Sequence, residues 1–257
     1  MNRLKNCFLN KKNQVLSIFF TAGFPNLEDT LPIIQYLSNA GVDIIEIGFP
    51  FSDPLADGPI IQNSNQIAIK NGMNLKLLFQ QLKNVREYTQ IPLILMGYLN
   101  PILQFGIKEF FENCSNIGID GLILPDMPLE YYQNHFKNYF ESYNIANIFL
   151  ITPQTSSERI HLLDKITNGF LYVVSSNTVT GGNSMLENQI TYFQRIQSYN
   201  LQNPTLIGFG IHNKKTFDFA CQFSHGAIIG SAFIQFLKNS NGVNQNNIRE
   251  FVQSIKI

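Results

Sequence analysis

The sequence has no excess of charge of either sign, because 18 Lys and Arg residues balance 18 Asp and Glu residues. Nucleic acids and anionic membranes attract basic proteins, so this balance gives no electrostatic reason to expect either partner. The chain also lacks an apolar run of the length that crosses a bilayer. Its first residues, Met1 to Cys7, include no apolar stretch of the kind found in secretory signals. We therefore expect a protein that works away from membranes and nucleic acids.

Cysteine and histidine are both scarce. The three cysteines, Cys7, Cys114 and Cys221, are odd in number and lack the spacing of metal ligands, so a reducing, cytosol-like compartment is the simplest interpretation. His212 and His225 lie near loops of interest, but neither has a second His at metal-ligand spacing. We expect no metal, and we expect a cytoplasmic protein, or one of the plastid stroma if the chain is organellar.

No Gly-, Ser- or Pro-rich linker divides the chain, which predicts one domain over residues 1–257. Short apolar runs typical of buried strands alternate with amphipathic stretches typical of helices. The expected strands are Val15–Thr21, Val42–Ile47, Ile91–Met96, Gly121–Leu124, Asn147–Ile151, Phe170–Val174, Thr205–Gly208 and Gly226–Ile229. The expected helices are Leu27–Ala40, Asn74–Tyr88, Ile107–Ile117, Leu129–Tyr143, Ser156–Thr167, Met185–Tyr199 and Lys214–Phe223. This alternation predicts an α/β fold, a closed (β/α)8 TIM barrel rather than an open sheet.

A barrel of this kind carries its functional groups just after the C-terminal ends of its strands. Polar and glycine-rich segments of this sequence fall at those places. They are Asp53 and Asp57 after the second strand, Tyr98 and Asn100 after the third, Asp126 after the fourth, 178–182 after the sixth, 208–211 after the seventh and 230–231 after the eighth.

Glu46 is the most informative of the candidate residues, since it stands within the apolar run Ile44-Ile45-Glu46-Ile47. A carboxylate in a buried strand is costly to keep ionised unless it is paired, which favours a role in proton transfer over a structural one. Asp57 follows on a loop stiffened by prolines. Taken alone, Asp57 is better explained as the residue that closes an Asp-Gly turn. Asp53 and Asp126 are interpreted as residues that fix their loops.

The glycines after strands six, seven and eight indicate an anion site. Glycine lets backbone N–H groups approach a phosphate closely. Gly230-Ser231 is expected to open a short helix, whose N-terminus favours a phosphate. Each Gly pair alone is a weak signal, but three such loops in consecutive late positions favour phosphate binding.

The stretch from Glu46 to Pro59, EIGFPFSDPLADGP, closely resembles the signature of the tryptophan synthase alpha subunit family. Further motifs occur in the order of that family along the whole chain. They are FTAGFP at 20–25, MGYLNP at 96–101, LPDMP at 124–128, VTG at 179–181, GFGI at 208–211 and GS at 230–231.

This resemblance implies a lyase that cleaves indole-3-glycerol phosphate to indole and glyceraldehyde 3-phosphate in tryptophan biosynthesis. It implies that Glu46 is the general acid and base, and that Asp57 accepts a hydrogen bond from the indole N–H. The resemblance also implies the substrate-binding residues Phe20, Tyr98, Ile151 and Tyr172 around the indole, Thr180 near the catalytic acid, and Gly181, Gly210, Gly230 and Ser231 around the phosphate.

The same resemblance implies no cofactor in this chain and a PLP-containing beta subunit as partner in an αββα heterotetramer. The partner would dock at the barrel mouth, near Asp53-Pro54, Asn100-Pro101 and Pro128-Leu129. The rival interpretations are a stand-alone lyase, a non-catalytic regulatory barrel, and a phosphosugar isomerase or aldolase. A Schiff-base aldolase needs a Lys within a strand, and none of the eight expected strands contains one.

Two positions depart from the family pattern. Thr178 stands where the loop Ser-x-x-Gly-Val-Thr-Gly has glycine, and a β-branched residue at positive φ costs about 1–3 kcal/mol. We predict altered ordering of this loop rather than lost chemistry. Met96, two residues before Tyr98, is a flexible side chain that is expected still to fill the indole slot.

Overall fold

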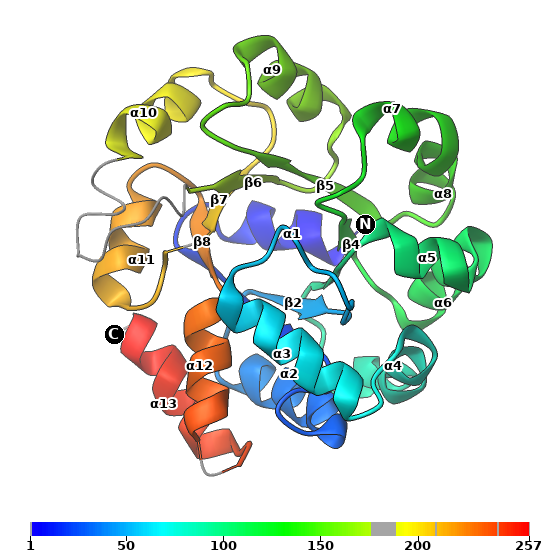
Figure 1. Cartoon of the computed structure of the whole chain (residues 1–257). Coiled ribbons are helices and arrows are strands. Elements are labelled where there is room, and N and C mark those ends of the chain that lie inside the picture. The colour runs from blue at the N-terminus through cyan, green and yellow to red at the C-terminus, as the bar shows by residue number, and fades with distance from the viewer. Residues whose placement is uncertain (1, 176–188, 209, 241, 257) are drawn as a thin grey trace.

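The computed structural model describes residues 2–175, 189–208, 210–240 and 242–256 of the chain. Its strands pair in parallel and in sequence order, and β8 returns to β1 to close a barrel (Figure 1). The strands are β1 (Val15–Thr21), β2 (Ile44–Gly48), β3 (Leu93–Met96), β4 (Gly121–Ile123), β5 (Ala146–Ile151), β6 (Leu171–Val174), β7 (Thr205–Gly208) and β8 (Gly226–Ile229). The predicted TIM barrel is therefore confirmed.

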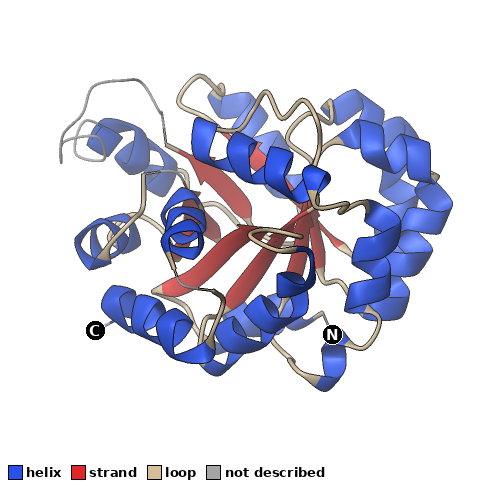
Figure 2. Cartoon of the chain, turned by 60° about the horizontal axis from the view of Figure 1, so that its bottom comes forward, coloured by secondary structure: helices blue, strands red, loops and turns tan. Residues whose placement is uncertain are grey.

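Helices surround the strands on the outside of the barrel (Figure 2). They are α1 (Arg3–Asn10), α2 (Thr30–Asn39), α3 (Pro59–Lys70), α4 (Leu75–Leu82), α5 (Leu99–Phe105), α6 (Ile107–Ile117), α7 (Leu129–Tyr131), α8 (Lys137–Ser142), α9 (Ser157–Ile166), α10 (Ile190–Ser198), α11 (Lys214–Cys221), α12 (Ser231–Asn239) and α13 (Gln245–Lys256). Short turns of other helix types add η1 (Leu27–Asp29), η2 (Val85–Glu87) and η3 (Tyr132–Phe136). Within the described ranges, no helix is both long and apolar enough to span a membrane.

The predicted elements agree closely with the observed ones. Three strands, β1, β7 and β8, have the predicted bounds, and the other strands differ by one or two residues at an end. The predicted helix over 129–143 is divided, because a π-helical turn, η3, separates α7 from α8. The predicted helix over 185–199 corresponds to α10, and its residues 185–188 lie outside the described ranges.

The helices α1, α3, α5 and α13 were not predicted. The start of α3 was concealed by its composition: Pro59 follows Gly58 and resembles a loop residue, although proline suits the first position of a helix. The last helix, α13, buries Ile248, Val252 and Ile255 and packs against α2 and α11. That spacing is helical and is visible in the sequence.

The strands are apolar on both faces because both faces are covered. Across β1, β2 and β3, Phe19 pairs with Glu46 and Glu46 pairs with Ile94, so these three side chains share the inner face of the barrel. Phe20 and Ile47, which alternate with them, pack on the outer face and are 0% exposed. Glu46 is thus a carboxylate inside the barrel.

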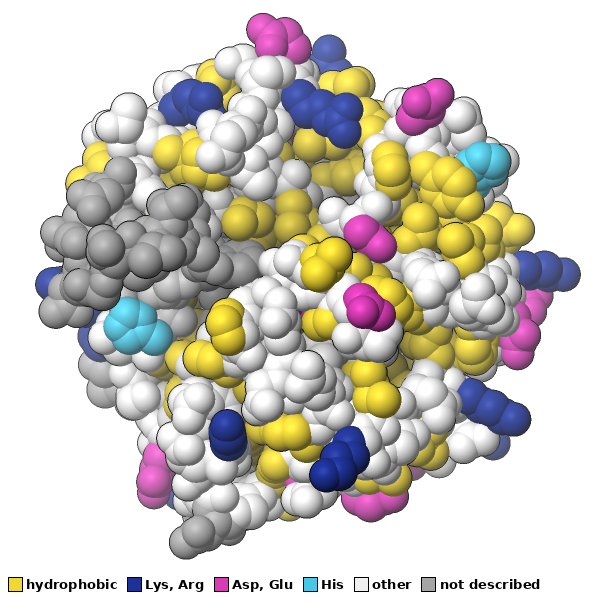
Figure 3. Space-filling view, in the orientation of Figure 1, with side chains coloured by type: hydrophobic (Ala, Val, Ile, Leu, Met, Phe, Trp, Pro, Cys, Tyr) yellow, Lys and Arg dark blue, Asp and Glu magenta, His cyan; other side chains and the backbone are white. Residues whose placement is uncertain are grey.

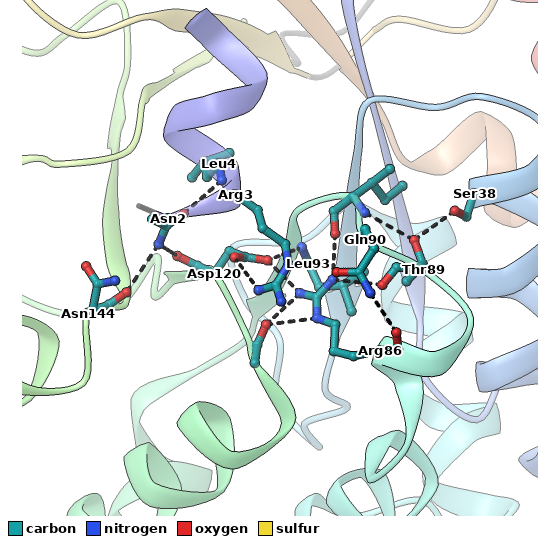
Figure 4. A network of polar contacts seen from close by, with 12 residues as sticks. Asn2, Arg3, Leu4, Ser38, Arg86, Thr89, Gln90, Leu93, Asp120 and Asn144 are labelled. Carbon is teal, nitrogen blue, oxygen red and sulfur yellow. Dashed lines mark hydrogen bonds and ion pairs between the residues drawn. The ribbon is translucent and has the colours of Figure 1, made fainter. Parts of the chain in front are cut away.

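The N-terminal end of the barrel is fastened by Asp120, which precedes β4 (Figure 4). Its carboxylate accepts hydrogen bonds from Arg86 at 2.6 Å, from Arg3 of α1 at 3.3 Å and from the Leu93 backbone N–H at 3.0 Å. Asn2 donates from its side chain to the Asp120 carbonyl at 2.8 Å. This network fixes α1 under the barrel, at the end away from the loops that carry the candidate site.

Candidate active site

A cavity of about 340 Å³ opens at the C-terminal ends of the strands. Its wall includes Phe19 from β1, Met96 from β3, Tyr172 from β6 and Ile228 from β8, with Asp57 from the loop after β2. A smaller hollow adjoins the cavity, shares Phe19, Asp57 and Met96 with it, and adds Tyr98. On this face of the molecule, Lys and Arg side chains lie mostly toward the rim (Figure 3). The cavity is therefore a largely apolar slot at the place where barrel enzymes carry their active sites.

Glu46 lies inside the barrel, fully buried on β2. Its Oε1 accepts a hydrogen bond from the Ser17 hydroxyl of β1 at 2.7 Å, while Oε2 has no partner among the described residues. Burial raises the pKa of Glu46 to about 7, and the Ser17 bond lowers it in part. Such a group can exist in either protonation state near neutral pH, which is the property that an acid–base catalyst needs.

Asp57 is held by groups from three directions. Its carboxylate Oδ2 accepts a hydrogen bond from the Tyr98 hydroxyl at 3.2 Å, and its carbonyl accepts one from Gln62 of α3 at 2.9 Å. Its own N–H donates to the Pro54 carbonyl at 3.0 Å. Burial raises the pKa of Asp57 to about 6, and the bond from Tyr98 lowers it. Asp57 thus presents a fixed, partly buried carboxylate to the cavity, rather than serving only as a turn residue.

Tyr172 forms part of the cavity wall close to both carboxylates. Burial raises the pKa of Tyr172 well above its ordinary value, and the charges of Glu46 and Asp57 raise it further. Its ring lies over Gly208 of β7, where a Cβ atom would come within 2.1 Å of the Tyr172 hydroxyl oxygen. Glycine is required at position 208 because any side chain there would displace the ring.

The glycine-rich end of the cavity contains Gly210, Gly230 and Ser231. Gly210 has φ of +73°, a conformation that other residues rarely adopt. Gly230 precedes α12, which starts at Ser231, so the predicted helix opening is confirmed. Helix N-termini present unpaired N–H groups to anions, so this end can hold a phosphate. The predicted site residues Thr180 and Gly181, with Thr178, lie outside the described residues.

Among the predicted site residues that the structure describes, Glu46 is 0% exposed and is not part of the cavity wall or of the adjoining hollow. Phe20 and Ile151 do not reach the cavity either. Both are 0% exposed. Phe19 takes the place expected for Phe20, since it lines the cavity and its neighbour in the strand faces the opposite side. Leu150 pairs with Tyr172 across β5 and β6, so Ile151 faces the outer layer. Phe19 and Leu150, each one residue earlier, lie on the inner face instead, because in a strand one residue reverses the face.

The contacts of Asp126 support its interpretation as a loop-fixing residue, while that of Asp53 stays a prediction. The Asp126 carboxylate accepts hydrogen bonds from the Leu99 N–H at 3.0 and 3.1 Å, which orders the start of α5. The Asp53 carboxylate accepts a hydrogen bond from the Ser52 hydroxyl beside it. Neither carboxylate lines the cavity.

Sequence reasoning missed Ser17, Phe19 and His212 as site residues. Ser17 is a polar residue in the apolar run of β1, which was a signal that could have been used. His212 lines the cavity near Gly210 and was set aside because it lacks a metal-ligand partner. Among the described residues, no three His, Cys, Asp or Glu side chains converge as metal ligands.

Comparison with known proteins adds an independent finding. A family model described as "Tryptophan synthase alpha chain" matches residues 5–256. The tryptophan synthase alpha chain of Flavobacterium psychrophilum is 56% identical over 256 residues, covering 99% of this chain and 100% of that relative. The corresponding protein of Flavobacterium johnsoniae is 54% identical over 257 residues, with 100% of both chains covered. Among solved structures, tryptophan synthase subunit alpha of Legionella pneumophila superposes with a TM-score of 0.88 at 30% identity, covering 100% of this chain and 97% of that one.

Proposed function

The chain belongs to the tryptophan synthase alpha chain family, a family of lyases that cleave indole-3-glycerol phosphate in tryptophan biosynthesis, and we propose that Glu46 and Asp57 carry out this cleavage here. The observation that carries the proposal is the buried Glu46 carboxyl, which lies inside a barrel whose cavity has Asp57 in its wall. One of its oxygens has no partner among the described residues, and its pKa is raised to about 7.

In the proposed mechanism, the protonated Glu46 carboxyl gives its proton to C3 of the indole ring. The ring then carries a positive charge, and the indole N–H donates its hydrogen bond to the Asp57 carboxylate. The bond from C3 to the glycerol side chain breaks, and its electron pair returns to the ring. At the same time the adjacent hydroxyl loses its proton to Glu46 and becomes the aldehyde. The protonated indole serves as the electron sink, and Glu46 is regenerated in its starting form.

The remaining site residues are proposed as substrate contacts. Tyr172 and Tyr98 are placed beside the indole ring, where Phe19 and Met96 support its apolar faces. Gly210, Gly230 and Ser231 would receive the phosphate, and their position at the glycine-rich end of the cavity supports this role. The same role is proposed for Gly181, and Thr180 is proposed to act near Glu46.

We further propose that residues 1–257 form one catalytic domain that needs no cofactor of its own. PLP belongs to the beta subunit of this enzyme, and we propose that the chain joins that subunit in an αββα heterotetramer. The proposed contacts are at the barrel mouth, where Leu55 is 89% exposed on the loop after β2. The proposed location is the cytoplasm, or the plastid stroma in an organellar setting.

An assay of indole release from indole-3-glycerol phosphate tests these proposals. The purified chain should release indole, the rate should rise when a beta subunit is added, and Glu46→Gln should abolish release in both conditions. A strong rate without a partner, unchanged by the beta subunit, would favour a stand-alone lyase. If the wild-type chain released no indole in either condition, the interpretation as a non-catalytic regulatory barrel would be favoured.

A further inference from the structure

The phosphate end of the cavity contains a histidine that the proposed mechanism does not use. The cavity wall includes His212 and Gln235 together with Gly210, Gly230 and Ser231. No Lys or Arg is among the described residues of this wall, and the carboxylate of Asp57 lines the same cavity. A phosphate monoester carries up to two negative charges, which without His212 the described wall would meet only with uncharged donors: backbone N–H groups and the side chains of Ser231 and Gln235. Among the described side chains of the wall, His212 is the one whose protonated form is a cation with two ring N–H donors.

The His212 ring makes one hydrogen bond and its backbone makes another. Its Nδ1 lies 2.8 Å from the carbonyl oxygen of Gly210, and because a carbonyl can only accept, Nδ1 carries a proton. Its backbone N–H donates to the Thr216 hydroxyl at 3.0 Å, within the cap that starts α11. With Nδ1 engaged, the other ring nitrogen, Nε2, is left for a second partner. Protonation of Nε2 then creates both a positive charge and a hydrogen-bond donor.

We propose that His212 is a phosphate-binding residue, whose imidazolium donates from Nε2 to the substrate phosphate at the glycine-rich end of the cavity. This inference rests on the proposed function, because it names a further group that holds the same substrate. Asp57 is the charged group that shares the cavity wall with His212. On α11, Lys214 is paired with Asp218 at 3.2 Å. The phosphate therefore finds in His212 a cation that the rest of the described wall does not offer.

Kinetics of His212→Ala and His212→Gln test the proposal. A hydrogen bond to a charged group contributes about 1.5–3 kcal/mol, so His212→Ala should raise KM for indole-3-glycerol phosphate at least about tenfold, with kcat changed less than about twofold. The inhibition constant of inorganic phosphate should rise by a similar factor. Affinity for indole, which has no phosphate, should stay constant. His212→Gln, which keeps a polar side chain without the charge, should recover only part of the loss.

Calorimetry supplies a readout that a purely structural role would not change. Titration of the wild type with inorganic phosphate in two buffers of different ionisation enthalpy should show proton uptake, and His212→Gln should remove that uptake. The matched control is His161→Ala, on α9 and away from the cavity. It should alter neither KM for indole-3-glycerol phosphate nor the inhibition constant of inorganic phosphate. The proposal would be overturned if KM and the inhibition constant of phosphate both changed less than twofold in both His212 variants. It would also be overturned if the variants lost affinity for indole by the same factor as for phosphate. If the wild type released no indole, the lyase assignment would fail, while phosphate binding would still decide the role of His212.

Discussion

Glu46→Gln should stabilise the protein while it abolishes the reaction. The pKa of Glu46 is raised from its ordinary value of 4.5 to about 7, chiefly by burial. Ionisation is therefore less favourable in the folded chain than in the unfolded one. A raised pKa contributes stability that is complete below the unfolded value and is lost as the pH rises through the folded value. Glutamine keeps the shape and can still accept the Ser17 hydrogen bond, but it never ionises.

The magnitude follows from the two pKa values. The interval between 4.5 and about 7 corresponds to about 3 kcal/mol, since each pKa unit is worth about 1.4 kcal/mol. The variant should accordingly exceed the wild type by about 3 kcal/mol near pH 8 and by only about 1 kcal/mol near pH 5. For a chain of this size, the gain near pH 8 is a rise in Tm of roughly 6–12 °C.

Urea unfolding of both proteins at the two pH values is the direct assay, with thermal melts as a second measure. Glu250→Gln on α13, an exposed position, serves as the matched control and should change stability by less than about 0.5 kcal/mol at either pH. Equal stability of the wild type and Glu46→Gln near pH 8 would refute the reasoning. So would a gain that is the same at both pH values, because ionisation could not then be its cause.

Three further predictions concern other parts of the structure. Asp120→Asn, which leaves two arginine partners without their carboxylate, should lower the free energy of unfolding by about 3 kcal/mol in urea, and a loss below about 1 kcal/mol would contradict a structural role for the ion pairs. Gly208→Ala should lower kcat/KM at least about tenfold, because the new methyl group would displace the Tyr172 ring, whose hydroxyl would lie 2.1 Å away; wild-type kinetics would refute this. The hydrogen bond from Tyr98 lowers the pKa of Asp57, which burial raises to about 6 in all. Tyr98→Phe removes this bond, so the pKa of Asp57 and the acidic limb of the pH profile of kcat/KM should move to higher pH, and an unmoved limb would exclude the effect.

The proposed acid–base residue could be read from the sequence. Glu46 is conspicuous there because a carboxylate within an isoleucine run is costly in any fold that buries the run. The barrel itself also followed from the alternation of short apolar runs with amphipathic helices. Gly230-Ser231 could be recognised as a helix opening, since glycine followed by serine precedes the apolar pattern of α12.

The assignment of faces within strands was less secure. Phe19 and Phe20 are adjacent, aromatic and equally apolar, so their chemistry does not distinguish the residue that faces the cavity. Ile151 and Leu150 present the same ambiguity on β5. In strands covered on both sides, apolar residues occupy both faces, so in β1 only Ser17, two residues before Phe19, hints at the inner face, and the pairing with neighbouring strands resolves it.

By itself, then, the sequence determined the order of strands and helices and the presence of a buried acid, because these depend on local composition and period. Only the tertiary structure decided which groups meet. Ser17 reaches Glu46 from 29 residues away, and His212 comes to lie in one cavity wall with Gly230. The first meeting depends on the pairing of β1 with β2, and the second on the pairing of β7 with β8. The register of these pairings is set by contacts between segments distant in the sequence, which no local segment specifies.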